Sequence, residues 1–160
     1  MGKRSVKANK NEYQLAREAA GLTREAASER MDYVSADRIE KVEAERSAPH
    51  PDEILAMAEA YKKPSLCNYY CSQECPIGQK YVPPVELKTL PQITLEIISL
   101  LNTLEAEKNV FIEIAADSRI TAEEMQKFSR IQQKLGQLKI AVDTLQLWVE
   151  QSEAEGELGE

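Results

Sequence analysis

The sequence has few of the residues that break or cross-link a chain: six glycines, seven prolines and three cysteines among 160 residues. Aromatic residues make up only 6% of it. The low glycine content and the near absence of polar–apolar alternation argue against a β-sheet fold. No run approaches the roughly 20 apolar residues that a membrane span needs, and the polar N-terminus lacks a signal-peptide pattern. We therefore expect an all-α, soluble, cytoplasmic protein without a membrane partner.

Residue patterns that are typical of enzymes are also missing. The chain has no phosphate-binding glycine loop, no His-Glu-x-x-His pattern and no nucleophile with a plausible base. His50 is the only histidine and lies between two prolines, so we expect it at the surface rather than in a catalytic site. We expect neither enzymatic activity nor a cofactor.

The net charge of −7 is unevenly distributed along the chain. Residues 1–66 contain 12 basic and 12 acidic side chains, whereas residues 67–160 contain 8 and 15. The overall field opposes binding to a polyanion, so any such affinity has to come from local basic groups. Lys3, Arg4, Lys7 and Lys10 form a basic arm, which either lies along phosphates or stays a disordered terminus.

Two short amphipathic helices are expected between residues 23 and 46. Thr23 can cap the first, from Arg24 to Met31, and Ser35 can cap the second. Ile39 and Val42 share one face of the second helix, and its other face is polar. A small helix with an apolar back and a polar front, held across another helix, is the geometry that enters a DNA major groove.

This stretch resembles the lambda repressor-like helix-turn-helix family, the Cro or xenobiotic-response-element type, over roughly residues 13–63. The shared features are Gly21-Leu22-Thr23, Ser35, Val42-Glu43 and Pro49, in that order. The resemblance implies a five-helix domain that binds double-stranded DNA as a transcriptional regulator. The helix after Ser35 would be the recognition helix.

The resemblance also implies which side chains face DNA. They are Arg24, Ser35, Ala36, Asp37, Arg38, Lys41 and Arg46. Arg24 and Arg46 would contact phosphate, Arg38 and Lys41 would donate to guanine, and Asp37 would accept from cytosine. The alternative is a protein-interaction module on the same scaffold with little DNA affinity. The acidic residues of the recognition helix favour it, because they repel phosphates.

The other helices around this pair are expected from their caps. One starts at Asn9 or Asn11 and stops at Gly21, and another starts at Pro51 and ends before Pro64. Ala27 is a small side chain at an expected core position, so we expect either Tyr33 or Val34 to fill the space that it leaves.

All three cysteines lie on an expected fifth helix, which Ser65 would cap and Pro76 with Gly78 would end. The spacing of Cys67, Cys71 and Cys75 places them on one stripe. They are either metal or iron–sulfur ligands, as in a metal- or redox-responsive regulator, or reduced thiols packed in the core. We favour packed thiols and no metal, because the three span about 12 Å of helix.

The positions of the helix-breaking prolines and glycines indicate how the whole chain is organised. Residues 76–91 contain five prolines and glycines and are expected to be a linker. It would join a domain at 1–75 to an antiparallel two-helix hairpin at 92–152, followed by a frayed acidic tail at 153–160. The second hairpin helix should begin at Thr121, with Glu124 completing a capping box.

Both hairpin helices carry apolar stripes at heptad spacing that are too wide for two helices to bury. The stripes either pack on the N-terminal domain or pair two copies into a four-helix bundle. We expect the homodimer, because the stripe is about 40 Å long. The residues expected at its interface are Ile97, Leu101, Leu104, Phe111, Phe128, Leu135, Leu138, Val142, Leu145 and Trp148.

Overall fold

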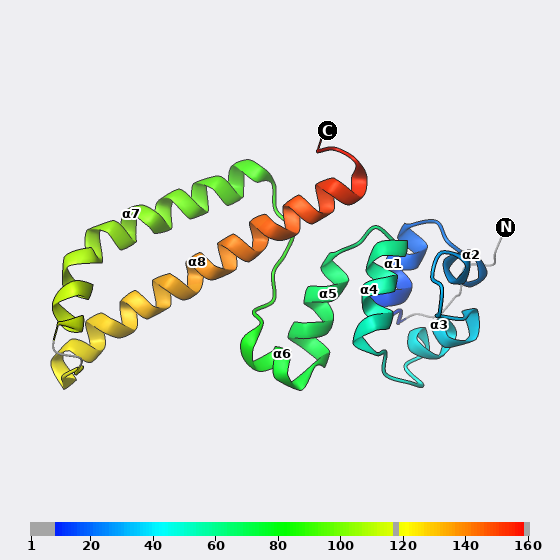
Figure 1. Ribbon diagram of the computed structural model, residues 1–160, viewed down its shortest axis with the longest axis horizontal. Helices are drawn as coiled ribbons and strands as arrows, with labels where there is room; N and C mark the ends of the chain where they lie inside the picture. Colours follow the sequence, from blue (N-terminus) through cyan, green and yellow to red (C-terminus); the bar gives the residue numbers. More distant parts are fainter. Residues whose placement is uncertain (1–8, 117–118, 159–160) are drawn as a thin grey trace. The chain divides into compact units, whose positions relative to one another are not determined.

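A computed structural model describes residues 9–116 and 119–158 of the chain. Within these residues every regular element is a helix, which confirms the expected all-α class (Figure 1). The chain divides into two compact units. We call the one within residues 1–84 and 149–160 the head, and the one within residues 85–148 the hairpin. None of the described helices is both long and apolar enough to span a membrane.

The head begins with four short helices; a side-chain oxygen caps each of the first three, and the fourth starts at a proline. They are α1 (Glu12–Ala19), α2 (Arg24–Glu29), α3 (Ala36–Glu43) and α4 (Pro51–Ala60). The Thr23 hydroxyl accepts from the Ala26 amide at 3.1 Å, and the Ser35 hydroxyl accepts from the Arg38 amide at 3.2 Å. Both expected caps are confirmed. α2 is shorter than expected, because its last turn tightens and the Met31 amide bonds back to the Ser28 carbonyl.

The core of the head lies between these helices and the start of α5 (Ser65–Tyr69). Its largest buried side chains include Ile39, Ile54, Met57 and Leu66. Of the two residues expected to fill the space left by Ala27, Val34 is 1% exposed and Tyr33 is 60% exposed. Val34 therefore fills the core, while the Tyr33 hydroxyl donates to the Asp52 carbonyl at the surface.

The segment after α5 differs from the single helix expected there. The π-helical turn η1 (Tyr70–Glu74) widens the winding, and the Cys75 amide donates to the Tyr70 carbonyl five residues back. Pro76 does not end a helix but begins α6 (Pro76–Tyr81). Proline is favoured at the first position of a helix, because its missing amide would have no helical partner there. Part of the expected linker at 76–91 is thus helical, and Ser65 is the first residue of α5 rather than its cap.

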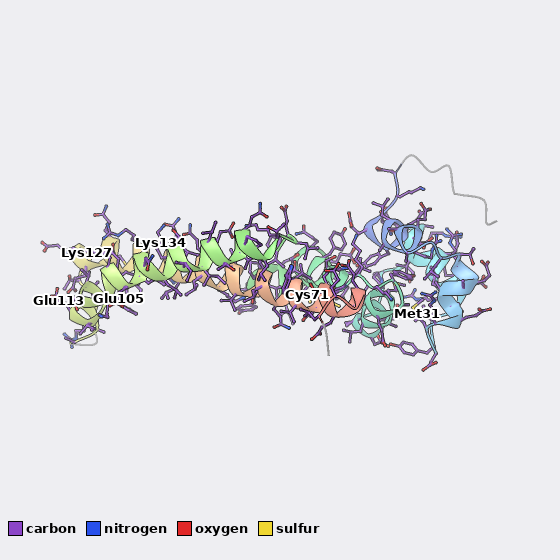
Figure 2. All side chains as sticks on the ribbon, turned by 90° about the horizontal axis from the view of Figure 1, so that it is seen from above. Met31, Cys71, Glu105, Glu113, Lys127 and Lys134 are labelled. Atoms are coloured by element: carbon purple, nitrogen blue, oxygen red, sulfur yellow. The ribbon has the colours of Figure 1, made fainter. Side chains whose placement is uncertain are left out.

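The hairpin consists of α7 (Leu90–Ala115) and the part of α8 (Ala122–Glu155) before Val149, which lie side by side (Figure 1). The expected capping box is present: the Thr121 amide donates to the Glu124 carboxylate at 2.9 Å. Phe111 and Phe128 meet across the two helices with ring centroids 6.4 Å apart. Charged side chains such as Glu105 and Lys127 follow both helices (Figure 2).

One polar residue interrupts the apolar stripe of α7. Glu107 pairs with Arg130 of α8 at 2.8 Å, which gives its carboxylate a partner across the hairpin.

The last turns of α8 differ from the frayed tail expected at 153–160. The helix is regular to Glu155 and ends in a left-handed Gly156, at φ 74°. Glu157 and Leu158 follow it, and residues 159 and 160 lie outside the described part.

Candidate nucleic-acid interface

α3 has a buried side and a polar side, as its sequence predicts. Ile39 and Val42 are almost fully buried, whereas Asp37 and Lys41 are exposed. Asp37 and Lys41 are one helical turn apart, so they lie on the same face. Neither side chain makes a hydrogen bond or an ion pair with the described residues of the chain. They give this face one free acceptor and one free donor, with the half-buried Ala36 methyl next to them.

Arg38 lies on α3 beside this pair but turns its guanidinium toward α4. Its Nε donates to Glu53 Oε1 at 2.6 Å and its Nη2 to Glu53 Oε2 at 2.7 Å. Its other bonds go to the Ser47 hydroxyl at 2.6 Å and the Ala48 carbonyl at 2.8 Å. These four bonds leave little of the five-donor guanidinium for a base. The hydrogen bonds from Arg38 hold the pKa of the Glu53 carboxyl below its usual value, although burial opposes this.

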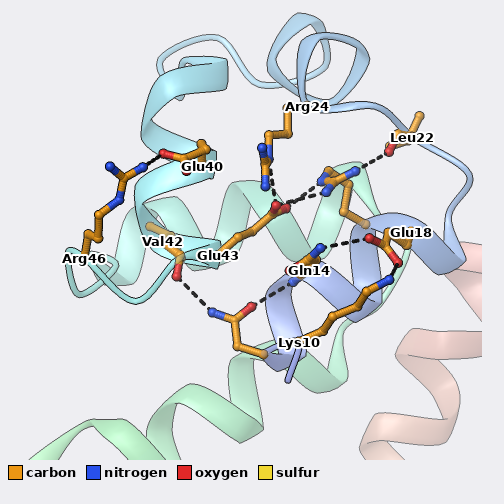
Figure 3. A network of polar contacts seen from close by, with 11 residues as sticks. Lys10, Gln14, Glu18, Leu22, Arg24, Glu40, Val42, Glu43 and Arg46 are labelled. Atoms are coloured by element: carbon orange, nitrogen blue, oxygen red, sulfur yellow. Dashed lines mark hydrogen bonds and ion pairs between the residues drawn. The ribbon is translucent and has the colours of Figure 1, made fainter. Parts of the chain in front are cut away.

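Arg24 also points into the head. Its Nε donates to Glu43 at 2.8 Å, and Figure 3 shows Arg24 and Glu43 facing each other. The same carboxylate receives two bonds from Arg17 of α1, at 2.5 and 2.9 Å. Burial disfavours the charge on Arg17, but the hydrogen bonds and charge of Glu43 outweigh it and raise the guanidinium pKa. This buried network ties α1, α2 and α3 together.

The sequence contains a signal for this network. Arg17 lies four residues after Tyr13, on the buried side of α1, and Glu43 lies four after Ile39 on the buried side of α3. A charged side chain on the buried side of a helix is unfavourable unless it is paired, so an arginine and a glutamate in such positions on two helices are expected to pair with each other. On α1 itself Gln14 is buried, whereas Leu15 is 43% exposed.

The last predicted phosphate contact, Arg46, pairs with Glu40 at the surface (Figure 3). Lys10 of the basic arm pairs with Glu18 at 2.5 Å, and the arm residues Lys3, Arg4 and Lys7 lie outside the described residues. Three of the four basic residues in the predicted DNA-facing set therefore have carboxylate partners, and Lys41 alone has none among the residues that the structure describes.

The three cysteines are free and half-buried. The Cys75 sulfur accepts from the Gly78 amide at 3.4 Å and so caps α6. Burial, helped by the neighbouring Cys71 and Glu150, raises the pKa of the Cys67 thiol. Among the described residues, no cluster of His, Cys, Asp and Glu side chains fits a metal ion.

The expected dimer residues fall into two groups. Ile97, Leu104, Phe128, Leu138, Leu145 and Trp148 are half-buried in the chain itself. Leu101, Phe111, Leu135 and Val142 are 40–50% exposed. Three further apolar side chains of α7, Leu95, Ile98 and Ile112, are more than half exposed. The hairpin thus buries one side of its apolar stripes and leaves an apolar flank in solvent.

Comparison with known families gives one match in the head. Residues 14–64 fit the family model described as a helix-turn-helix domain. Comparisons with curated proteins and with solved structures found no match. The matched residues run from within α1 to just past α4, and they include α2, α3 and the turn between them. Residues 14–64 are therefore similar in sequence to a helix-turn-helix domain.

Proposed function

We propose that this protein is a cytoplasmic, DNA-binding transcriptional regulator. The observation that carries the proposal is the outer face of α3 within a helix-turn-helix match, where Asp37 and Lys41 are exposed one turn apart. In a major groove Lys41 would donate to guanine O6 or N7, and Asp37 would accept from the N4 amine of cytosine.

In this proposal the ion pairs of the head give the three arginines different roles in DNA binding. Arg38 orients α3 through Glu53, so it acts on DNA reading through position rather than through a base contact. Arg24 and Arg46 can still reach phosphates with the nitrogens that their carboxylates leave free, because each makes a single described bond. Phosphate contacts then place the head, and the Lys41–Asp37 pair reads the bases.

The hairpin would pair two copies through its apolar flank. A patch of large exposed apolar side chains on a charged helix pair is unfavourable in water, and a second copy would cover it. Two heads would then read two half-sites about one helical turn, or 34 Å, apart.

Binding to a mixed pool of DNA fragments at several salt concentrations tests this function. A regulator binds with an affinity that falls steeply as salt rises, because bound cations are released from the phosphates. Selected fragments should then lose about 1–3 kcal/mol of binding free energy with Lys41→Ala. Lys139→Ala, which removes the same charge from the hairpin, is the control and should bind as the wild type does. Salt-independent or absent binding by the folded protein would contradict the proposal.

A protein-interaction module with little DNA affinity is the second candidate. It is favoured by the carboxylates that neutralise Arg24, Arg38 and Arg46 within the head. These pairs weaken the positive potential that DNA binding needs. The same titration separates the two functions, since the module would give no salt-dependent signal.

A further inference from the structure

The last turns of α8 belong to the head rather than to the hairpin. The Gln151 side-chain amide donates to the Lys62 carbonyl at 3.3 Å, across 89 residues of sequence. Ser152 is 3% exposed. Ala154 lines a groove of about 330 Å³ together with Leu55 and Ala58 of α4 and Cys67 of α5. Residues 149–155, which we call the latch, therefore lie on α4 and α5.

The latch contacts α4 at the point where its carbonyls lose their helical partners. Lys62 follows the helix in the left-handed region, at φ 53°, and the Lys63 amide closes the end by donating to the Ala58 carbonyl at 2.8 Å. Carbonyls past a helix end need partners from elsewhere. Gln151 supplies such a donor to the Lys62 carbonyl, so the latch holds the chain just past the C-terminal end of α4.

The opposite end of α4 holds the recognition helix. Glu53, in the first turn of α4, receives two of the four hydrogen bonds of Arg38. α4 has ten residues and is about 15 Å long, so one short rigid helix connects the latch contact to the α3 contact. A rigid element held at both ends moves as a body when one end is freed.

We propose that the latch sets the position of α3 through α4, and that its release loosens the DNA-reading face. Because α8 runs without a break from the hairpin into the latch, a change in the hairpin, such as loss of pairing, would act on the head by this route. The regulatory part of this inference rests on the proposed DNA binding. The structural part, that release of the latch loosens α3, does not depend on DNA binding.

The test uses full-length protein in which Cys71→Ser and Cys75→Ser leave Cys67 as the single thiol. A serine at 75 can keep the cap on the Gly78 amide. Ala154→Asp puts a charge into the apolar groove and should release the latch, whereas Glu153→Asp, at the exposed neighbouring position, is the matched control. The readouts are the rate of Cys67 alkylation by iodoacetamide and hydrogen exchange of the α3 amides.

Latch release should raise the Cys67 alkylation rate at least about tenfold and speed exchange in α3, with exchange in α7 unchanged. Gln151→Ala, which removes one hydrogen bond and keeps the fold, should raise both by a smaller factor, about two- to fivefold. The control should match the parent. Unchanged alkylation in both variants would overturn the latch, and faster alkylation without faster α3 exchange would overturn its coupling to α3.

DNA affinity is measured on the same variants. If alkylation and exchange respond as expected but the parent protein does not bind DNA, the coupling of the latch to α3 is supported and the proposed DNA-binding function is contradicted. If the parent binds DNA and Ala154→Asp binds as well as the parent, the regulatory role of the latch is overturned.

Discussion

Arg38 of α3 and Glu53 of α4 form a two-point ion pair, with both nitrogen–oxygen distances below 2.8 Å. A planar guanidinium facing a carboxylate in this way gives both strength and a fixed geometry. The side chain of Arg38 is 20% exposed and that of Glu53 is 10% exposed, so water competes little for the pair. The angle between α3 and α4 thus depends on it.

Arg38→Ala should lower the free energy of unfolding by about 2–3 kcal/mol, because it leaves the Glu53 carboxylate without its charged partner. Arg38→Lys should recover only part of this, since an ammonium cannot make the two-point contact. Urea unfolding of the single and double variants with Glu53→Ala measures the coupling. Additive losses from the two single variants would show that the pair contributes nothing.

The same pair gives the head an acid-sensitive stability. The folded-state pKa of Glu53 lies below the ordinary 4.5, so its stabilisation is complete above that value and is lost as the pH falls from there through the folded pKa. Urea unfolding between pH 6 and pH 3 should show this loss. Glu53→Gln should flatten the slope, and Glu59→Gln, at an exposed carboxylate of the same helix, should leave it as it is.

Glu45→Gly should stabilise the head by about 0.5–1 kcal/mol. Glu45 lies just beyond α3 at φ 57°, a region that glycine enters without a steric penalty. Lys41→Gly, inside the same helix, should instead destabilise by about 1 kcal/mol. Thermal melting monitored by circular dichroism distinguishes the two changes, and a destabilised Glu45→Gly variant would contradict the assigned backbone conformation.

Gly78 and Gly136 should respond to alanine in opposite directions. A Cβ at Gly78 would lie 2.0 Å from the Cys71 carbonyl oxygen, so Gly78→Ala has to push α6 away from η1. A Cβ at Gly136 meets nothing within 4 Å, and Gly136→Ala should stabilise α8 by about 1 kcal/mol. Thermal melts of both variants test this, and equal shifts would mean that α6 does not pack this closely.

Leu101→Lys and Ile112→Lys should shift the proposed homodimer toward monomer without loss of helix. Leu101 is 46% exposed and Ile112 62% exposed in the single chain, so a charge there disturbs a paired state far more than the single chain. Sedimentation equilibrium over a range of concentrations measures the shift. Lys139→Glu, a change of charge at an exposed polar position, is the control. A wild-type chain that stays monomeric at high concentration would remove the dimer from the proposal.

Local chemistry made much of the head predictable from the sequence. Thr23, Ser35 and Thr121 mark helix starts because a side-chain oxygen satisfies amides that the first turn leaves free. The spacing of Ile39 and Val42 gave the buried side of α3. Such rules act within a few residues, which is why the helices and their match to a helix-turn-helix domain are already visible in the order of the residues.

What the sequence could not decide is which charged groups meet. Arg38 reads locally as a free donor on a polar helix face, and only the fold brings Glu53 of the next helix within bonding distance. Gln151 reaches Lys62 only because the chain returns to the head after the whole hairpin. The sequence by itself determined where most of the helices start and which side of α3 is buried, since these follow from near neighbours. The tertiary structure decided which charges remain free for a partner, because ion pairing depends on distances between segments far apart along the chain.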